Sequence, residues 1–204
     1  MRFESRYLLV LLFSTVFARL TTAQSYTPSD AISVINRLGG FSLHKVTNES
    51  QWLWLITDYS ATLDGTVVTV EETNSNLQEN ARTGETCRFN ATVHTKYVFD
   101  IRDMQSTITL VPVNSPGAAQ WPNDARINAV FSTKNSRKLV RVVVRQDPIT
   151  CSTPADAYFQ PSKNDSTGLV ITFAGIDAAN QLKSMVASAW QQSPRISAAK
   201  KTNE

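Results

Sequence analysis

Histidine, glycine and cysteine are all scarce in this chain, which has two, seven and two of them among 204 residues. With only His44 and His94 present, a histidine-based metal or nucleophile site has few ligands to draw on, and the H-E-x-x-H and G-x-S-x-G motifs do not occur. Gly39 and Gly40 are the only adjacent glycines, so the sequence has no glycine-rich phosphate-binding loop. We therefore expect no cofactor, no metal site and no recognisable catalytic residues.

An excess of charge of one sign is also missing. Lys and Arg number 20 against 17 Asp and Glu, which gives a formal net charge of +3. Domains that bind nucleic acids usually carry a strongly basic surface. We therefore expect no nucleic-acid partner.

The one long apolar run lies near the N-terminus, from Tyr7 to Ala18. It follows Arg2 and Arg6 and precedes the small residues 21–23, which is the pattern of a cleavable secretory signal. A membrane-spanning helix needs about 20 apolar residues, so the run predicts export rather than anchoring. Removal of residues 1–23 takes away three arginines and one glutamate and lowers the formal charge from +3 to +1.

The predicted export divides the chain into three parts. These are a signal peptide over residues 1–23, a single β-rich domain over 24–192 and a disordered polar tail over 193–204. We expect a secreted or periplasmic protein with no transmembrane segment after signal cleavage. The only two cysteines, Cys87 and Cys151, lie in the exported part, where an oxidising environment favours a disulfide between them.

Two amphipathic helices are expected at the ends of the domain. Residues 27–40 begin with Thr27 as N-cap and Pro28 at the first helical position, and they end at two glycines. A second helix follows Asp177, with apolar residues at helical spacing up to Trp190. Residues 73–92 are polar and without period, which predicts a loop.

Seven segments between the helices have the alternation or the β-branched content of strands. They are 52–57, 66–71, 93–101, 107–113, 127–132, 139–145 and 169–174. The fifth and sixth are expected to form a hairpin through residues 134–137. The elements together predict an α+β fold, built on a strongly bent antiparallel sheet or a partly open barrel of about seven strands, with an N-terminal helix and a C-terminal capping helix.

The element order over residues 52–192 resembles the pleckstrin-homology-like superfold, in which seven strands are followed by one amphipathic helix. Trp190 on the last helix and the strand between Gly168 and Gly175 carry the resemblance. Phosphoinositide-binding members of that group have basic residues between their first two strands. The corresponding segment here, 58–65, has two aspartates and no base, so the resemblance does not imply inositol phosphate binding.

A second architecture is an up-and-down barrel of the lipocalin type, which also ends its strands with a helix and carries apolar ligands. The Gly-x-Trp signature of that family is missing before the first tryptophans of the domain. In a carrier of this kind an apolar pocket between sheet and helix would be lined by Trp52, Trp54, Phe99 and Trp190. The alternative is that these aromatic residues simply form the core.

The densest group of positive charge lies around the predicted hairpin. It consists of Lys134, Arg137, Lys138, Arg141 and Arg145. One interpretation is a solvated turn and a sheet edge protected from aggregation by its charges. The functional interpretation is a surface that contacts an anionic partner, such as a lipid headgroup, a polysaccharide or a partner protein.

Three Asn-x-Ser/Thr strings, at Asn48, Asn90 and Asn164, are conditional glycosylation sites. Asp100, Asp103 and His94 are the closest candidates for acid–base chemistry, although aspartates at strand ends also suit turns. We expect an exported, non-catalytic binding module that contacts a macromolecule or an apolar ligand. The alternatives are a small-molecule carrier with an apolar cavity and an exported hydrolase of unfamiliar type.

Overall fold

The computed structural model describes residues 25–48, 51–88, 91–113, 125–147, 150–151 and 162–190. The predicted signal peptide, the predicted tail and Asn90 lie outside the described residues. The helices are α2 (Pro28–Leu38) and α3 (Ile176–Ala189), with short 3-10 turns at η1 (Ile101–Asp103) and η3 (Lys134–Ser136). The strands are β1 (Gly40–Asn48), β2 (Gln51–Asp64), β3 (Val67–Asn80), β4 (Thr86–Arg88), β5 (Thr92–Asp100), β6 (Thr109–Pro112), β7 (Ile127–Ser132), β8 (Val140–Asp147), β9 (Ser162–Ser166) and β10 (Gly168–Phe173).

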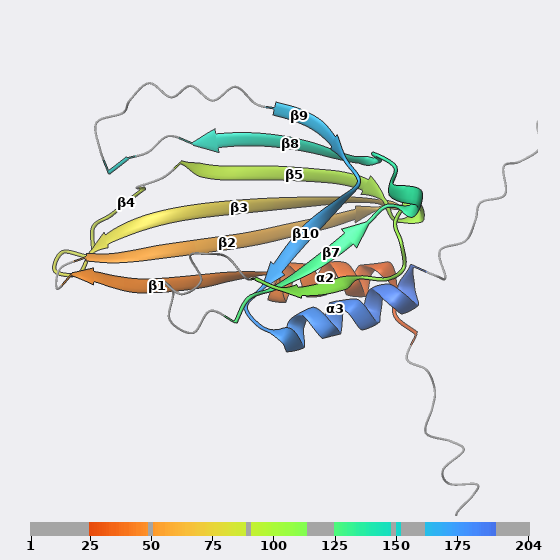
Figure 1. The fold of residues 1–204 in the computed structure, drawn as a ribbon, viewed down its shortest axis with the longest axis horizontal. Helices are drawn as coiled ribbons and strands as arrows, with labels where there is room; N and C mark the ends of the chain where they lie inside the picture. Colours follow the sequence, from red (N-terminus) through yellow and green to blue (C-terminus); the bar gives the residue numbers. More distant parts are fainter. Residues whose placement is uncertain are drawn as a thin grey trace, which may run out of the picture.

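The described strands form one open sheet of ten strands in the order β6-β7-β10-β1-β2-β3-β5-β8-β9, with β4 paired to β3 (Figure 1). Every pairing is antiparallel except that of β1 with β10. The predicted β-rich fold with one helix near each end is confirmed. The predicted count of about seven strands is wrong, because β1, β4 and β9 were not expected, and the sheet does not close into a barrel.

The loop predicted over residues 73–92 is also wrong. Most of this segment continues β3 to Asn80 and then returns as β4. β2 pairs with the whole of β3, and on the other side of β3 the partners are β5 at residues 67–74 and β4 at residues 77–79. Two ladders of backbone hydrogen bonds therefore hold a strand whose side chains have little β propensity.

The hairpin predicted between residues 127–132 and 139–145 does not form. β7 pairs with β6 and β10, whereas β8 pairs with β5 and β9. The chain diverges after Thr133, whose buried hydroxyl lies 2.6 Å from the carbonyl oxygen of Arg137 and 3.0 Å from that of Thr167. Gly168 lets β10 approach at this point, since a Cβ there would lie 2.0 Å from the carbonyl oxygen of Phe131.

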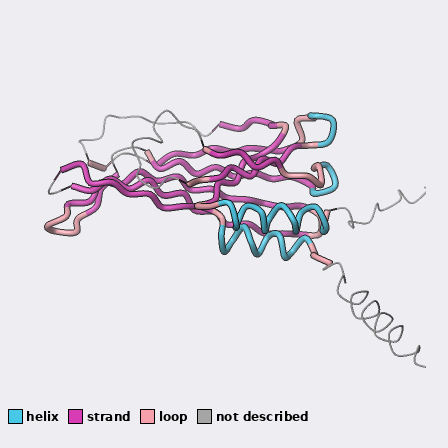
Figure 2. The backbone as a smooth tube through the Cα atoms, turned by 60° about the horizontal axis from the view of Figure 1, so that its bottom comes forward, coloured by secondary structure: helices cyan, strands magenta, loops and turns pink. Residues whose placement is uncertain are grey.

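Helix α2 begins as the sequence predicts. The Thr27 hydroxyl accepts a hydrogen bond from the Asp30 backbone N–H, and the Asp30 carboxylate accepts one from the Thr27 backbone N–H at 2.7 Å, which completes a capping box. The apolar face of α2 packs on β2 and α3, and the two helices lie side by side on one side of the sheet (Figure 2).

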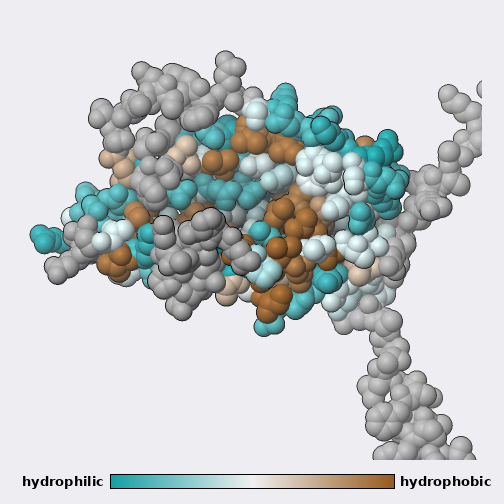
Figure 3. Space-filling model, viewed as in Figure 1, coloured by the Kyte–Doolittle hydropathy of each residue, from teal (hydrophilic) through white to brown (hydrophobic). Residues whose placement is uncertain are grey.

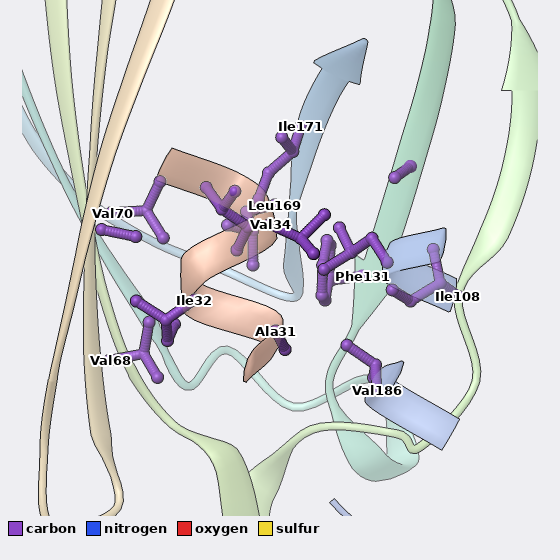
Figure 4. Packing of buried hydrophobic residues seen from close by; sticks show 14 of the residues in the cluster. Ala31, Ile32, Val34, Val68, Val70, Ile108, Phe131, Leu169, Ile171 and Val186 are labelled. Atoms are coloured by element: carbon purple, nitrogen blue, oxygen red, sulfur yellow. The ribbon is translucent and has the colours of Figure 1, made fainter. Parts of the chain in front are cut away.

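The apolar core lies between two arms of the sheet, one made of β6, β7 and β10 and the other of the strands from β1 to β9 in the sheet order. Figure 4 shows Ile32 and Val34 of α2 with Val68 and Val70 of β3 on one side and Leu169 of β10 on the other, and all five are buried. Trp190 is also part of the core, and its ring centroid lies 5.6 Å from that of Phe131. Neither α2 nor α3, nor either short turn, is long and apolar enough to cross a membrane.

Strands β1, β2 and β3 continue well beyond the helices (Figure 1). We call residues 42–48, 51–56 and 73–80 the distal ribbon, and none of its described side chains is buried. The predicted disulfide is confirmed near this end of the sheet, where Cys87 of β4 is bonded to Cys151 with their Cα atoms 5.0 Å apart. The bond ties the β3–β4 hairpin to the chain that follows β8.

Candidate ligand-binding groove

The two faces of the sheet differ because strand side chains alternate. In β5, Tyr97 and Phe99 point toward the core, whereas Lys96 and Val98 point away from it. We call the side of β3, β5, β8 and β9 that is turned away from α2 the outer face. Within the described residues, α2 packs mainly on β2 and α3, and α3 packs mainly on α2, β7 and β10.

A groove of about 780 Å³ opens on the outer face between β5, β8 and β9. Its volume lies in the range of ligand sites in proteins, about 300–1,000 Å³. Its lining residues are Lys96, Val98, Lys138, Arg141, Val143, Lys163, Asn164 and Asp165. Because all but one of them lie on these three strands, hydrogen-bonded sheet fixes their backbone positions.

Strand register arranges most of these residues in two rows that run across the strands. The first row is Lys96, Val143 and Lys163, and the second is Val98, Arg141 and Asp165. On β5 and β8 the rows are offset, so that Lys96 and Arg141 each lie beside a valine, and on β9 Lys163 is followed on the same face by Asp165. This placement gives the groove an apolar floor between separate positive charges.

The groove is strongly unbalanced in charge, with four cations and one carboxylate. Lys96 is paired, since its ammonium nitrogen lies 2.9 Å from Glu71 Oε1. Within the described part of the chain, the other three cations, Lys138, Arg141 and Lys163, make no ion pair. Their charge is therefore available to an anion from solution.

The structure brings together only part of the predicted basic cluster. Lys138 and Arg141 line the groove, but the Lys134 ammonium donates a hydrogen bond to the carbonyl oxygen of Arg102. Arg137 is exposed in the turn after η3, and Arg145 lies farther along β8. Two of the five residues therefore line the groove, and the other three do not.

Two groove cations, Lys96 and Lys163, were not among the predicted site residues. Lys96 alternates outward on β5, which the sequence pattern indicates, but its pairing with β8 depends on tertiary structure. Lys163 lies in the segment Ser-Lys-Asn-Asp-Ser of β9, which has no apolar alternation. No sequence signal marks that segment as a strand, so its lysine could not be placed.

Another charged group lies nearer the disulfide. The Asp147 carboxylate is 2.9 Å from His94 Nε2 and 3.5 Å from the Arg88 guanidinium, and His94 Nδ1 is 3.2 Å from the Thr73 hydroxyl. The hydrogen bond with His94 is the main cause of a lowered Asp147 pKa, and the positive charges of Arg145 and Arg88 add to it. The two ring nitrogens of His94 thus lie within hydrogen-bond distance of Thr73 of β3 and Asp147 of β8, the strands on either side of β5.

Asp100 and Asp103 lie at the end of β5 and in η1. The Asp100 carboxylate accepts hydrogen bonds from the Arg102 backbone N–H and guanidinium and from the Thr66 hydroxyl. The Arg102 side chain is the main cause of its lowered pKa. Asp100 therefore has the turn-forming role that aspartate often plays at strand ends.

The four aromatic residues proposed for an apolar pocket separate into two pairs. Trp52 and Trp54 stack with each other and with His44 on the distal ribbon, with ring centroids 4.8–6.1 Å apart. Phe99 and Trp190 are buried in the core with centroids 6.2 Å apart. The structure does not bring the two pairs together.

A buried polar cluster that sequence reasoning missed borders the core. The Glu72 carboxylate accepts hydrogen bonds from the hydroxyls of Tyr59 and Tyr97 at 3.1 and 2.9 Å and from the Asn74 amide at 2.9 Å. Burial, and then the negative charge of Glu72, raises the pKa of both tyrosines. Their hydroxyls therefore remain protonated donors that satisfy the carboxylate.

Two of the conditional glycosylation sites lie on described strands. Asn164 is exposed on β9 and lines the groove, and Asn48 ends β1. The described residues contain no group of histidine, cysteine and acidic side chains able to hold a metal ion.

The outer surface of the other arm of the sheet is more apolar. Figure 3 shows hydrophobic side chains over β7 and β10, and the exposed valines there include Val170, with Val111 on the neighbouring β6. Isolated exposed valines are common on soluble proteins, so this surface supports no site by itself.

No family model, curated protein or solved structure matches the chain, so the chemistry of the groove is the basis for its function.

Proposed function

We propose that the protein is an exported, non-catalytic binding module that binds an anionic partner in the groove between β5, β8 and β9. The observation that carries this function is the set of three cations, Lys138, Arg141 and Lys163, that share the groove without an ion-pair partner among the described residues. A concave surface lined by charge of one sign concentrates oppositely charged ligands.

The local charge stands out because the chain as a whole is only weakly basic, at +3. The groove therefore does not reflect a generally positive surface, which would attract any polyanion. Export rests on the N-terminal apolar run together with the Cys87–Cys151 disulfide, which is consistent with an oxidising compartment.

The two alternative functions have less support. A carrier that uses the four aromatic residues would need them around one cavity, and they lie in two separate places. A hydrolase that uses His94, Asp100 or Asp103 has less support because none of these residues lines the groove. A non-catalytic role therefore remains our preferred proposal.

Binding to heparin, a general polyanion, tests the function of the groove. We expect the double variant Arg141→Ala/Lys163→Ala to bind at least about tenfold more weakly, since hydrogen bonds to charged groups each contribute about 1.5–3 kcal/mol. Added salt should weaken binding of the native protein. Lys183→Ala, which removes an exposed lysine of α3, is the matched control and should bind normally. Equal binding by the groove variant and the control would contradict the proposed function.

A further inference from the structure

The groove offers more than positive charge, and its other groups restrict the class of anion. Val98 and Val143 form an apolar floor, and Asp165 provides a carboxylate at the β9 rim. Asp165 pairs with Arg141 in strand register, yet no ion pair joins it to a cation within the described residues. Its carboxylate is therefore available as a hydrogen-bond acceptor.

A ligand with dense negative charge would not use these groups. A polyphosphate or nucleic acid would be repelled by Asp165 and would gain nothing from the valines. A sugar ring that carries a carboxylate matches all three kinds of group. The carboxylate pairs with a cation, ring hydroxyls donate to Asp165, and the C–H surface of the ring packs on the valines.

The number of cations without an ion-pair partner favours a polymer over a single sugar acid. Lys138, Arg141 and Lys163 line the groove and make no ion pair among the described residues, and the lining has one carboxylate, that of Asp165. A single carboxylate carries one negative charge and leaves part of this positive charge unpaired, whereas successive carboxylates along a chain can pair with several cations.

We infer that the groove binds an acidic polysaccharide that carries one carboxylate per sugar ring. This inference rests on the proposed function of the groove and names its ligand class. Arg141 and Lys163 bind carboxylates, Asp165 accepts hydrogen bonds from hydroxyls, and Val98 and Val143 contact the ring.

Two polymers with the same charged group separate sugar recognition from simple charge attraction. Polygalacturonate carries a carboxylate and hydroxyls on each ring, and polyglutamate carries carboxylates without hydroxyls. We would measure the dissociation constant of the full exported chain for each polymer by calorimetry at fixed salt. The native protein should bind polygalacturonate several-fold more tightly.

Asp165→Asn gives the sharpest test because it removes the same negative charge for both polymers but replaces a charged acceptor with a neutral one only for the polymer that has hydroxyls. If Asp165 accepts hydroxyl hydrogen bonds, the preference for polygalacturonate over polyglutamate should fall about threefold in the variant, since a typical net hydrogen bond corresponds to a few-fold change in affinity. Asp165 lies in the exposed edge strand β9, and thermal unfolding would verify that the variant folds normally. Lys183→Ala is again the control.

The outcomes distinguish failure of the polysaccharide ligand class from failure of the proposed anion-binding function. If Asp165→Asn tightens binding of both polymers alike, the sugar class is wrong and the groove remains a general anion site. If the native protein binds both polymers equally, the sugar class is likewise wrong. If Arg141→Ala changes binding of neither polymer, both the ligand class and the proposed function fail.

Discussion

The same strands are stabilised differently in their two halves. Where α2 covers β2 and β3, the inward side chains Tyr59, Ala61, Val68 and Val70 are buried. In the distal ribbon the same strands have no buried side chain, although their pairing continues without interruption to Gln51 and Asn80. Backbone hydrogen bonding is thus uniform along the sheet, whereas burial of apolar surface is confined to one end.

The distal ribbon relies on contacts between neighbouring strands. His44, Trp52 and Trp54 stack on its outer side, and the Trp54 indole N–H donates to the Glu79 carboxylate at 2.8 Å. The disulfide of Cys87 lies next to it on β4. A long sheet can therefore extend past its core when contacts between neighbouring strands and a disulfide take the place of apolar burial.

The largest expected effect is in the covered half. Phe131→Ala removes a fully buried ring that contacts Trp190, and we expect a loss of about 3–5 kcal/mol in the free energy of unfolding. Chemical denaturation of the native protein and the variant measures the difference. A loss below about 1 kcal/mol would contradict the division of the sheet into a buried and an unburied half.

Removal of the disulfide should have the next largest effect. Cys87 and Cys151 are 64 positions apart, and a loop of that size corresponds to roughly 4 kcal/mol in the chain-entropy model. We expect the double variant Cys87→Ala/Cys151→Ala to lose about 2–4 kcal/mol of stability. Hydrogen exchange should become faster first near β4 and the end of β8, and slow exchange should persist in α2. Equal acceleration throughout the molecule would show that the bond does not act on the distal end in particular.

Truncation in the ring stack should cost less than truncation in the core. Trp54→Ala removes a half-buried ring and one hydrogen bond, and we expect a loss of about 1–2 kcal/mol. Trp54→Phe keeps an aromatic ring and should recover part of this loss. If Trp54→Ala destabilises as much as Phe131→Ala, the distal ribbon belongs to the core after all.

The smallest effect concerns acid. The pKa of Asp147 is lowered in the folded state, chiefly by its hydrogen bond with His94, so its contribution to stability is present above the unfolded pKa of about 3.9. It is lost as the pH falls through the folded pKa. Because the side chain is 38% exposed, the contribution should be below about 1 kcal/mol. Unfolding free energies between pH 6 and pH 2 should fall less steeply in Asp147→Asn, and identical slopes would contradict this role.

The helices could be predicted because their signals are local. Thr27, Pro28 and Asp30 specify the start of α2 within one turn, and the structure contains the capping box they predict. The spacing of Leu182, Val186 and Ala189 likewise gives α3 a buried face. Local hydrogen bonds and a helical period do not depend on which strand lies beside which.

Strands with polar residues could not be predicted, because their stability comes from neighbours. Residues 73–80 and 162–166 lack apolar alternation, yet both are paired strands. The strand after Gly40 alternates apolar residues with polar ones, but it begins directly after the glycines that end α2. A pattern within one segment does not reveal hydrogen bonds to another.

The candidate site shows the same division. The sequence indicates a basic cluster that includes Lys138 and Arg141, but it does not indicate that Lys96 and Lys163 join them or that Arg145 does not. Those placements depend on strand order, and the predicted hairpin had assigned β8 the wrong partner.

By itself the sequence determined the start of α2, the β-rich character and the cysteine pair, because each depends on residues whose effect is local or on the only pairing available. The ends of the helices were less well predicted, since α2 ends at Leu38 and Gly175, not Asp177, is the N-cap of α3. The strand order, the open sheet of ten strands and the groove were decided by tertiary structure. The physical reason is that a groove of Lys96, Arg141 and Lys163 exists only when β5, β8 and β9 are neighbours, and pairing between strands distant in the chain is a property of the whole fold.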